Sequence, residues 1–465
     1  MLFNSFAFPV FLAVGWAVYR LLHTRRLPRL LWLVLISAFF YGCWKPWYLL
    51  LIAISTLHSY HAGWRIDRTD DPTVRKRWLI LGIAGDLLLL GIFKYGNFSL
   101  ETVEALTGAP MPRIPAELPV GISFYTFQTL SYTIDLYMGR IQRSKSLLSF
   151  TTYVFFFPQL VAGPIVRARE FLPQLVEGGR PRLDKAALGE GIFLILAGLF
   201  KKMVLADMLA ARIVYPFFDA PANKSTLEAL VALWAANFQV YCDFSGYSDV
   251  AIGAALLFGF VLPQNFDRPF WSRTPMEHWR RWHISLSTWL KDYLYIPLGG
   301  SRKGDLRTDF NLTMTFLLGG LWHGAGWTFV VWGLYNGLLL AGWRRWGPKK
   351  AKSPLGVALL TFATFNSICF GLVFLHTPNF SEAMAAFGSL FSPTQAMTPG
   401  LLEPVGLGFL VFAAALHFTP QSWKETLKQG FAASPAWALG VTIVLVGGVL
   451  SLFAGLARPF FYFQF

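Results

Sequence analysis

Residues 315–337 read T-F-L-L-G-G-L-W-H-G-A-G-W-T-F-V-V-W-G-L-Y-N-G, two apolar stretches separated by a glycine-rich break that holds one histidine, His323. Glycine allows backbones or a ligand to approach closely, and irregular backbone at membrane depth is tolerated only where it is buried in protein or lines a cavity. The pattern therefore favours a functional histidine at this break over a histidine that only packs in a core.

The composition predicts that this break lies in an all-α polytopic membrane protein. Of 465 residues, 55% are hydrophobic and 14% are charged, whereas soluble domains average about 25% charged residues. Apolar runs long enough for a helix to cross the bilayer, which needs roughly 20 residues, recur along the chain. Besides shorter ones, they lie near 4–22, 78–96, 118–138, 187–212, 226–260, 325–342, 355–376, 404–419 and 435–457. A single membrane domain over 1–465 is expected.

The net charge of +15 predicts the orientation, because Lys and Arg accumulate in short cytoplasmic loops. The basic clusters lie at 20–29, 65–77, 140–145, 167–185, 268–307 and 344–352, and all are expected inside. The N-terminus is then extracytoplasmic, and its apolar run is kept as a helix because no basic region precedes it. Anionic membrane lipid is the expected partner of these loops, and no module indicates nucleic acid binding.

Known cofactor and metal motifs are missing from the sequence. Cys43, Cys242 and Cys369 are widely separated, with no C-x-x-C pair, and there is no Walker loop, G-x-G-x-x-G or H-E-x-x-H. No metal and no bound cofactor are expected.

A second histidine, His283, lies in the basic stretch 263–310. Thr274 can cap a helix there, and aromatic and aliphatic residues recur every three or four positions as far as Tyr293, which predicts one interfacial helix. His283 falls at the edge of its apolar face, where a structural role is the more common one. Several cations of this stretch are candidates to surround a phosphate-bearing donor. They are Arg268, Arg273, Arg280, Arg281, Lys291, Arg302 and Lys303, with Arg280, Arg281 and Lys291 as the main candidates.

Three weaker candidates form a polar patch inside the apolar run 226–260. Asp243, Ser245 and Tyr247 either line a tunnel or make hydrogen bonds between helices, and the sequence leaves both open. Asn336 is a candidate to orient His323 through a hydrogen bond.

Taken together, these motifs resemble the membrane-bound O-acyltransferase (MBOAT) superfamily. The resemblance is carried by W-R-R-W-H-I-S-L-S-T-W-L-K-D-Y-L-Y-I-P-L-G-G-S-R-K-G at 279–304 followed by G-G-L-W-H-G-A-G-W at 319–327. Further motifs lie at 118–137, 156–167 and 241–253, and in the ending F-F-Y-F-Q-F. The core region is 118–335, and the nearest branch is the bacterial one that contains the alginate O-acetyltransferase membrane subunit.

The resemblance implies about eleven transmembrane helices, with re-entrant and interfacial helices, around a tunnel. It implies that His323 is the catalytic residue deep in the tunnel and that His283, at a family position that is His or Asn, lies near its cytoplasmic mouth. A neutral imidazole suits this chemistry, because acyl transfer to a hydroxyl needs a base.

The expected reaction moves an acetyl group from a cytoplasmic thioester, acetyl-CoA or another acyl thioester, across the bacterial inner membrane. The acceptor would be an extracytoplasmic polysaccharide, reached with an SGNH-hydrolase-like partner. Two alternatives stay open: D-alanyl transfer from a carrier protein to a cell-wall polymer, and a non-enzymatic transporter in which the histidines relay protons.

Overall fold

The computed structural model describes residues 1–115, 117–161, 163–175, 183–348, 353–393, 395–456, 458 and 460–461. Parts of two basic clusters, 176–182 and 349–352, and the last four residues of the ending motif lie outside the described residues. Within the described ranges the regular structure is helical, as the composition predicts.

The chain divides into two compact units, residues 1–195 with 250–263, and residues 196–249 with 264–465. The helices α10 (Lys185–Leu199) and α13 (Thr226–Leu257) each contribute residues to both. The single domain expected over 1–465 stays a prediction.

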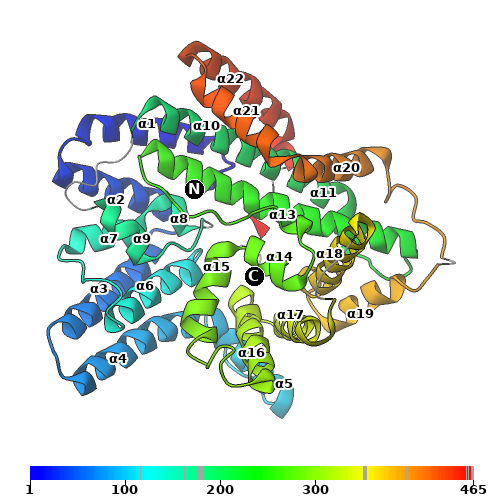
Figure 1. The fold of residues 1–465 in the computed structure, drawn as a ribbon, viewed down its shortest axis with the longest axis horizontal. Coiled ribbons are helices and arrows are strands. Elements are labelled where there is room, and N and C mark those ends of the chain that lie inside the picture. The colour runs from blue at the N-terminus through cyan, green and yellow to red at the C-terminus, as the bar shows by residue number, and fades with distance from the viewer. Residues whose placement is uncertain are drawn as a thin grey trace. The chain divides into compact units, whose positions relative to one another are not determined.

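In the first unit, α3, α4 and α6 pack against one another (Figure 1). This unit contains α1 (Ala7–Leu22), α2 (Arg26–Gly42), α3 (Tyr48–Asp67), α4 (Pro72–Leu90), η1 (Gly91–Tyr95), α5 (Gly96–Thr107), α6 (Ile122–Tyr137), α7 (Leu147–Phe155), α8 (Phe157–Leu160) and α9 (Ala168–Leu175). Their polar groups are paired across helices: the buried Asp86 carboxylate accepts hydrogen bonds from Ser55 at 2.9 Å and Ser59 at 2.8 Å. Such pairing makes a carboxylate tolerable between apolar helices.

The second unit is built on the long helix α13 and on the hairpin of α16 and α17 (Figure 1). Its first elements are η2 (Phe200–Ala206), α11 (Asp207–Leu209), η3 (Ala210–Val214), α12 (Tyr215–Phe218), η4 (Pro269–Trp271), α14 (Pro275–Arg281), α15 (Ile284–Leu290) and η5 (Lys291–Tyr295). They are followed by α16 (Asp305–His323), α17 (Trp327–Trp346), α18 (Pro354–His376), α19 (Phe380–Ser389), α20 (Pro404–Phe418), α21 (Gln421–Ala433), α22 (Ala436–Phe453) and η6 (Ala454–Leu456).

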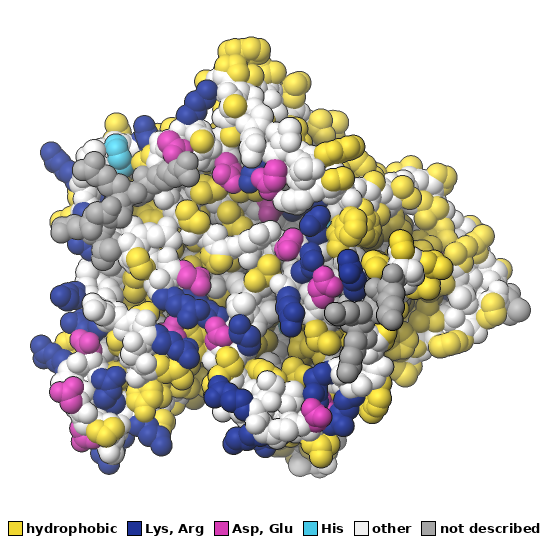
Figure 2. Space-filling model, viewed as in Figure 1, with side chains coloured by type: hydrophobic (Ala, Val, Ile, Leu, Met, Phe, Trp, Pro, Cys, Tyr) yellow, Lys and Arg dark blue, Asp and Glu magenta, His cyan; other side chains and the backbone are white. Residues whose placement is uncertain are grey.

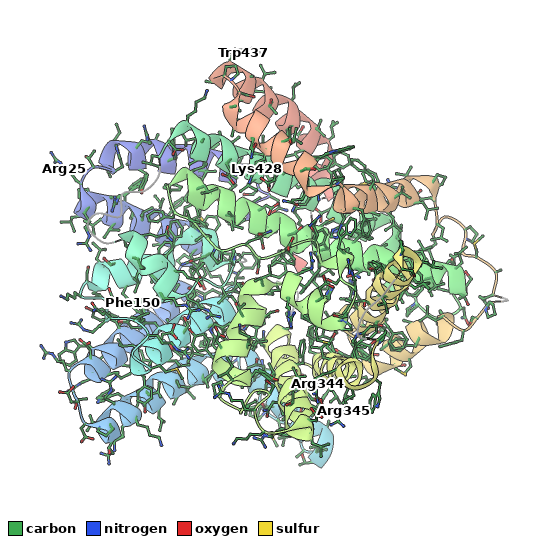
Figure 3. The ribbon with its side chains drawn as sticks, in the orientation of Figure 1. Arg25, Phe150, Arg344, Arg345, Lys428 and Trp437 are labelled. Carbon is green, nitrogen blue, oxygen red and sulfur yellow. The ribbon has the colours of Figure 1, made fainter. Side chains whose placement is uncertain are left out.

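Three stretches of described helix are long and apolar enough to cross a membrane: Pro72–Thr107, Pro354–His376 and Ala436–Phe453. A fourth results if α20 and α21, which are bent by 88°, are counted as one span. The polar side of α21 includes Lys428, and α22 begins near the exposed Trp437 (Figure 3). The composition of α21 suits a helix that lies along the membrane surface. The expected count of about eleven spans and the tunnel stay predictions.

Candidate active site

His323 is the last residue of α16 and is 6% exposed. Gly324 and Gly326 have extended backbones, so α16 ends at the histidine and α17 begins three residues after Gly324. The imidazole lies edge-on to Trp322 and Trp332, with ring centroids 5.1 and 5.0 Å away. The predicted histidine at a glycine-rich break between two helices is therefore confirmed.

Glycines bring the two helices of this hairpin into backbone contact. A Cβ atom on Gly333 would lie 2.9 Å from the Cα of Leu317, and one on Gly337 would lie 2.6 Å from the Cα of Thr313. Real Cβ atoms essentially never approach other atoms this closely. Small residues spaced four apart are the usual means of close helix packing in membranes. Because the backbones of α16 and α17 touch, their contact fixes the position of His323 at the end of α16.

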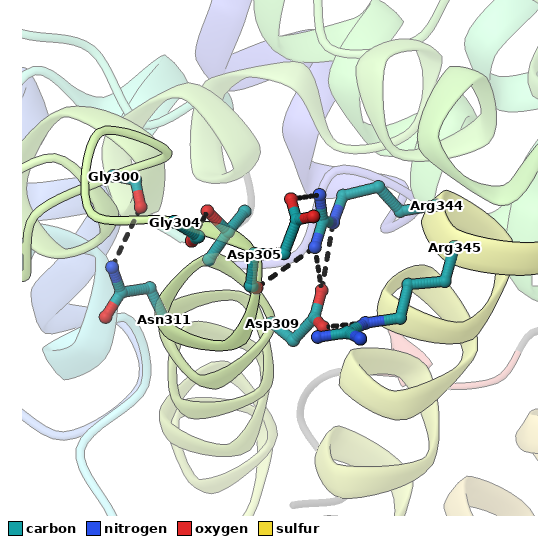
Figure 4. A network of polar contacts seen from close by, with 8 residues as sticks. Gly300, Gly304, Asp305, Asp309, Asn311, Arg344 and Arg345 are labelled. Atoms are coloured by element: carbon teal, nitrogen blue, oxygen red, sulfur yellow. Dashed lines mark hydrogen bonds and ion pairs between the residues drawn. The ribbon is translucent and has the colours of Figure 1, made fainter.

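Ion pairs fix the other end of the hairpin. Arg344 of α17 donates to Asp305 at 2.8 Å and to Asp309 at 2.6 Å, and Arg345 pairs with the same Asp309 (Figures 3 and 4). Asn311 donates from Nδ2 to the carbonyl of Gly300 at 2.8 Å, which holds the preceding loop to α16 (Figure 4). The register of the two helices is thus specified at both ends.

His283 does not lie within one continuous helix, and that part of the sequence prediction is wrong. Thr274 caps α14 as predicted, with its hydroxyl accepting from the Glu277 N–H at 3.1 Å, but α14 ends at Arg281. His283 has a left-handed backbone with φ of 42°, and α15 begins at Ile284. Non-glycine residues rarely adopt this conformation, so surrounding contacts must hold it.

Asn265 supplies those contacts, and no sequence pattern predicted it. Its Oδ1 accepts hydrogen bonds from the backbone N–H and the hydroxyl of Ser285, at 3.3 and 2.9 Å, and lies 3.1 Å from Nδ1 of His283. Because a backbone N–H can only donate, this oxygen is an acceptor and Nδ1 of His283 carries the proton. The lone pair of the neutral imidazole is then on Nε2.

His283 belongs to the segment 263–304, which lies outside the candidate spans. The environment of its side chain keeps the imidazole neutral. Burial, with repulsion from His323 as a second cause, holds the pKa of His283 well below its usual range. Its ring packs against Phe244 at 4.6 Å and against Trp322 at 6.1 Å. Trp322 also contacts His323, so the structure brings both predicted histidines to one aromatic cluster.

The polar patch of α13 makes contacts between helices. Lys202 lies 2.6 Å from Asp243 and 2.8 Å from Asp207, and the Asp243 carboxylate also accepts from the N–H of Phe461. Lys201 donates to Ser245 at 3.1 Å. Tyr247 is buried against Phe460, with ring centroids 4.4 Å apart. The contacts of Asp243 and Ser245 with the lysines of η2 agree with the alternative of hydrogen bonds between helices, whereas the contact reported for Tyr247 is ring packing. A role of the three residues in binding a donor stays a prediction.

The remaining candidate residues, three cations and Asn336, differ in exposure and in their hydrogen-bond or ion-pair partners. Arg280 and Lys291 are exposed, and Arg281 forms an ion pair with Glu277 at 2.9 Å. Asn336 donates to the carbonyl of Trp332, whose ring contacts His323. Their roles in donor binding and orientation stay predictions.

Within the described residues there is no group of three or more His, Cys, Asp or Glu side chains that could hold a metal ion.

Comparisons with known proteins identify the family of this chain. Residues 118–372 match the model of the MBOAT, membrane-bound O-acyltransferase family. The chain is 36% identical over 489 residues to the probable alginate O-acetylase AlgI of Pseudomonas putida, and the match covers 99% of each chain.

Two further relatives carry other names. A peptidoglycan O-acetyltransferase of Helicobacter pylori is 37% identical over 415 residues, which cover 83% of this chain and 78% of the relative. A teichoic acid D-alanyltransferase of Bacillus subtilis is 26% identical over 290 residues, which cover 58% and 73%. The family match spans both histidines and more than half of the chain, so the protein belongs to the membrane-bound O-acyltransferase family and is an O-acyltransferase enzyme.

Proposed function

We propose that this enzyme moves an acetyl group from a cytoplasmic acyl thioester, acetyl-CoA, to an extracytoplasmic polysaccharide, working with an SGNH-hydrolase-like partner. The observation that carries the proposal is the pair of buried histidines that meet at Trp322, one at the glycine-rich break and one held by Asn265. The relatives from Pseudomonas putida and Helicobacter pylori, which match 99% and 83% of this chain, are both named for O-acetylation, and the D-alanyltransferase of Bacillus subtilis matches only 58% of it, which favours acetyl transfer over D-alanyl transfer.

His323 serves as the general base in this proposal. Its imidazole accepts the proton of an acceptor hydroxyl, the oxygen attacks the thioester carbonyl carbon, and the C–S bond breaks. The departing thiolate takes the proton from the imidazolium, so the products are an ester and a free thiol. His283 positions the donor nearby: the hydrogen bond from Nδ1 to Asn265 leaves Nε2 as an acceptor, which can receive a hydrogen bond from an amide N–H of the donor's arm next to the thioester.

Exposed cations of the segment 275–304 support the proposal that a donor with a polyphosphate group binds at this segment. Arg280 and Lys291 are both exposed there; within the described residues Arg280 forms no ion pair, and Lys291 lies 3.6 Å from the carboxylate of Asp292. Arg281 is already paired with Glu277, so we assign it a smaller share of donor binding. The proposal places this segment at the cytoplasmic face of a bacterial inner membrane, with the N-terminus outside.

Replacing His323 tests the proposal. We expect His323→Ala to lower release of free CoA thiol by roughly 10²- to 10⁴-fold, because general-base catalysis contributes about that factor. The assay uses the purified protein in detergent with acetyl-CoA, the partner and a soluble glycan. His283→Asn should keep more activity than His283→Ala.

The exposed His61 provides a control, because His61→Ala should leave thiol release unchanged. Thermal unfolding of every variant separates loss of chemistry from loss of fold. Normal acetylation by His323→Ala would contradict the proposed base. Proton-coupled movement of an intact solute into liposomes, with no thiol released, would favour the transporter.

A further inference from the structure

A large cavity lies in the second unit, apart from the two histidines. Its volume is about 920 Å³, and it is bounded by α13, η4, α14, α18 and α20. This is near the upper end of the volumes of small-molecule sites, about 300–1,000 Å³. Its walls are mostly aromatic and aliphatic, and they include Trp271, Phe362, Phe365, Leu407, Ala414 and Phe418.

The cavity follows two apolar helices over a length of about half the thickness of a bilayer. It runs along α18 from Pro354 to Phe365 and along α20 from Leu407 to Phe418. At a rise of 1.5 Å per residue, each run is roughly 16 Å long. The hydrocarbon core of a bilayer is about 30 Å thick, so the cavity has the depth of one leaflet.

Part of the cavity rim is apolar and exposed on the surface of the protein. Phe362 of α18 is 57% exposed and Val411 of α20 is 69% exposed, although both line the cavity. α18 is a candidate span, and α20 begins the bent pair whose 88° turn follows Phe418. The length and composition of α18 suit a bilayer span, so a lipid can enter the cavity from the side across this exposed apolar rim.

Arginines lie at one end of the cavity. Arg268, Arg273 and Arg281 line it, Glu277 is the one acid among the described lining residues, and Glu277 is paired with Arg281 at 2.9 Å. Figure 2 shows Lys and Arg side chains next to hydrophobic ones in the region of α14 and α18. The positive charges of the other two arginines, Arg268 and Arg273, are therefore only weakly balanced by negative charge.

Of these two, Arg268 lies 3.8 Å from Asp267, and its buried Nε makes no hydrogen bond with the described residues. Arg273 is exposed and forms no ion pair within the described part of the chain. An anion at this end would complete the charge balance and supply acceptors for the guanidinium groups.

We propose that the cavity holds one anionic glycerophospholipid, with its acyl chains among the apolar side chains and its phosphate at Arg268 and Arg273. Depth, lateral opening and charge all fit this occupant. The site binds lipid without chemistry on it, and the proposal does not depend on the acetyl donor or on the polymer that the enzyme acetylates.

Lipid titration of the full-length protein in detergent, followed by native mass spectrometry, tests the proposal. The probes are phosphatidylglycerol and phosphatidylcholine with identical acyl chains. The wild type should bind phosphatidylglycerol at least about ten-fold more tightly, since each arginine near a lipid headgroup contributes about five-fold in affinity. The double variant Arg268→Gln/Arg273→Gln should lose this preference.

Two more variants separate the headgroup from the chains. Ala414→Trp fills the apolar part and should weaken both lipids, whereas Arg113→Gln, at an exposed arginine that does not line the cavity, should bind as the wild type does. Thermal unfolding without lipid shows whether each variant is folded.

Three results would overturn the proposal. One is equal affinity of the wild type for the two lipids, and another is a preference that survives in the double arginine variant. The third is displacement of bound phosphatidylglycerol by inorganic phosphate or by acetyl-CoA, which would assign the arginines to a soluble ligand.

Discussion

The two histidine-bearing breaks of the second unit are built in opposite ways. At His323 the chain is interrupted by glycines with extended backbones, and the flanking helices touch through glycine. At His283 the interruption is the histidine itself, in a left-handed conformation, held by the distant side chain of Asn265. The first break is relaxed and local, whereas the second is strained and depends on a residue 18 positions away. The second break should therefore be the more sensitive of the two to pH and to substitution.

Acid should cause the largest loss of stability, and the loss should originate in the His283 region. Burial lowers the pKa of His278 to about 4 and that of His283 well below its usual range. The unfolded chain takes up these protons near pH 6.5 and the folded chain does not. Stability is therefore complete above pH 6.5 and is lost as the pH falls towards 4, by about 1 kcal/mol per pH unit for each histidine.

Thermal unfolding in detergent between pH 8 and pH 5 measures this slope. His278→Asn should flatten it, and a wild type with constant stability over the range would show that the two imidazoles are not held neutral.

Asn265→Ala should cost about 1–3 kcal/mol of stability, because it leaves the Ser285 donors and His283 without their acceptor. Differential scanning fluorimetry detects the change. Gln264→Ala provides a neighbouring control, because among the described residues the Gln264 side chain donates only to the carbonyl of Phe266, two residues away. If the two variants unfold at the same temperature, Asn265 does not hold the second break.

At His283, Asn should be tolerated better than Ala by about 1 kcal/mol, because asparagine accepts the left-handed region more readily. At His323 the same pair of substitutions should show no such preference, since that residue is helical. Unfolding temperatures of the four variants give the comparison, and equal stability of Asn and Ala at both positions would show that the backbone at His283 is not strained.

The smallest effect is expected at the far end of the α16–α17 hairpin. Arg345→Gln removes a partly exposed ion pair with Asp309 that Arg344 also makes, so the loss should be below about 1 kcal/mol. Thiol release should be unchanged. A large loss would mean that glycine contacts alone do not hold the hairpin.

Sequence patterns correctly predicted the features that depend on residues close together in the chain. The glycines around His323 and the Thr274 cap are signals within a few positions, and both were correct. The aromatic periodicity of 279–293 continues through His283, so it predicted one helix and concealed the break. Nothing near Asn265 marks it, because its role arises only when the chain returns to it from 18 residues away.

Composition could not distinguish tunnel lining from helix contact in the α13 patch either. The ion pairs of Asp243 with Lys202, and of Lys202 with Asp207, depend on how α13 packs against η2. A hydropathy run over 187–212 gives no sign that this segment contains the π-helical turns η2 and η3, which alter the direction of its side chains.

The contact between Gly333 and Leu317 has a consequence for how substrates reach His323. With no side chain between the two backbones there, the hairpin has no spare volume to release and cannot widen by rotating side chains. We expect the α16–α17 pair to behave as a fixed wall during turnover, and the movement that admits donor and acceptor to come from the elements opposite it. If the hairpin is such a wall, a chemical cross-link between α16 and α17 should leave the enzyme active.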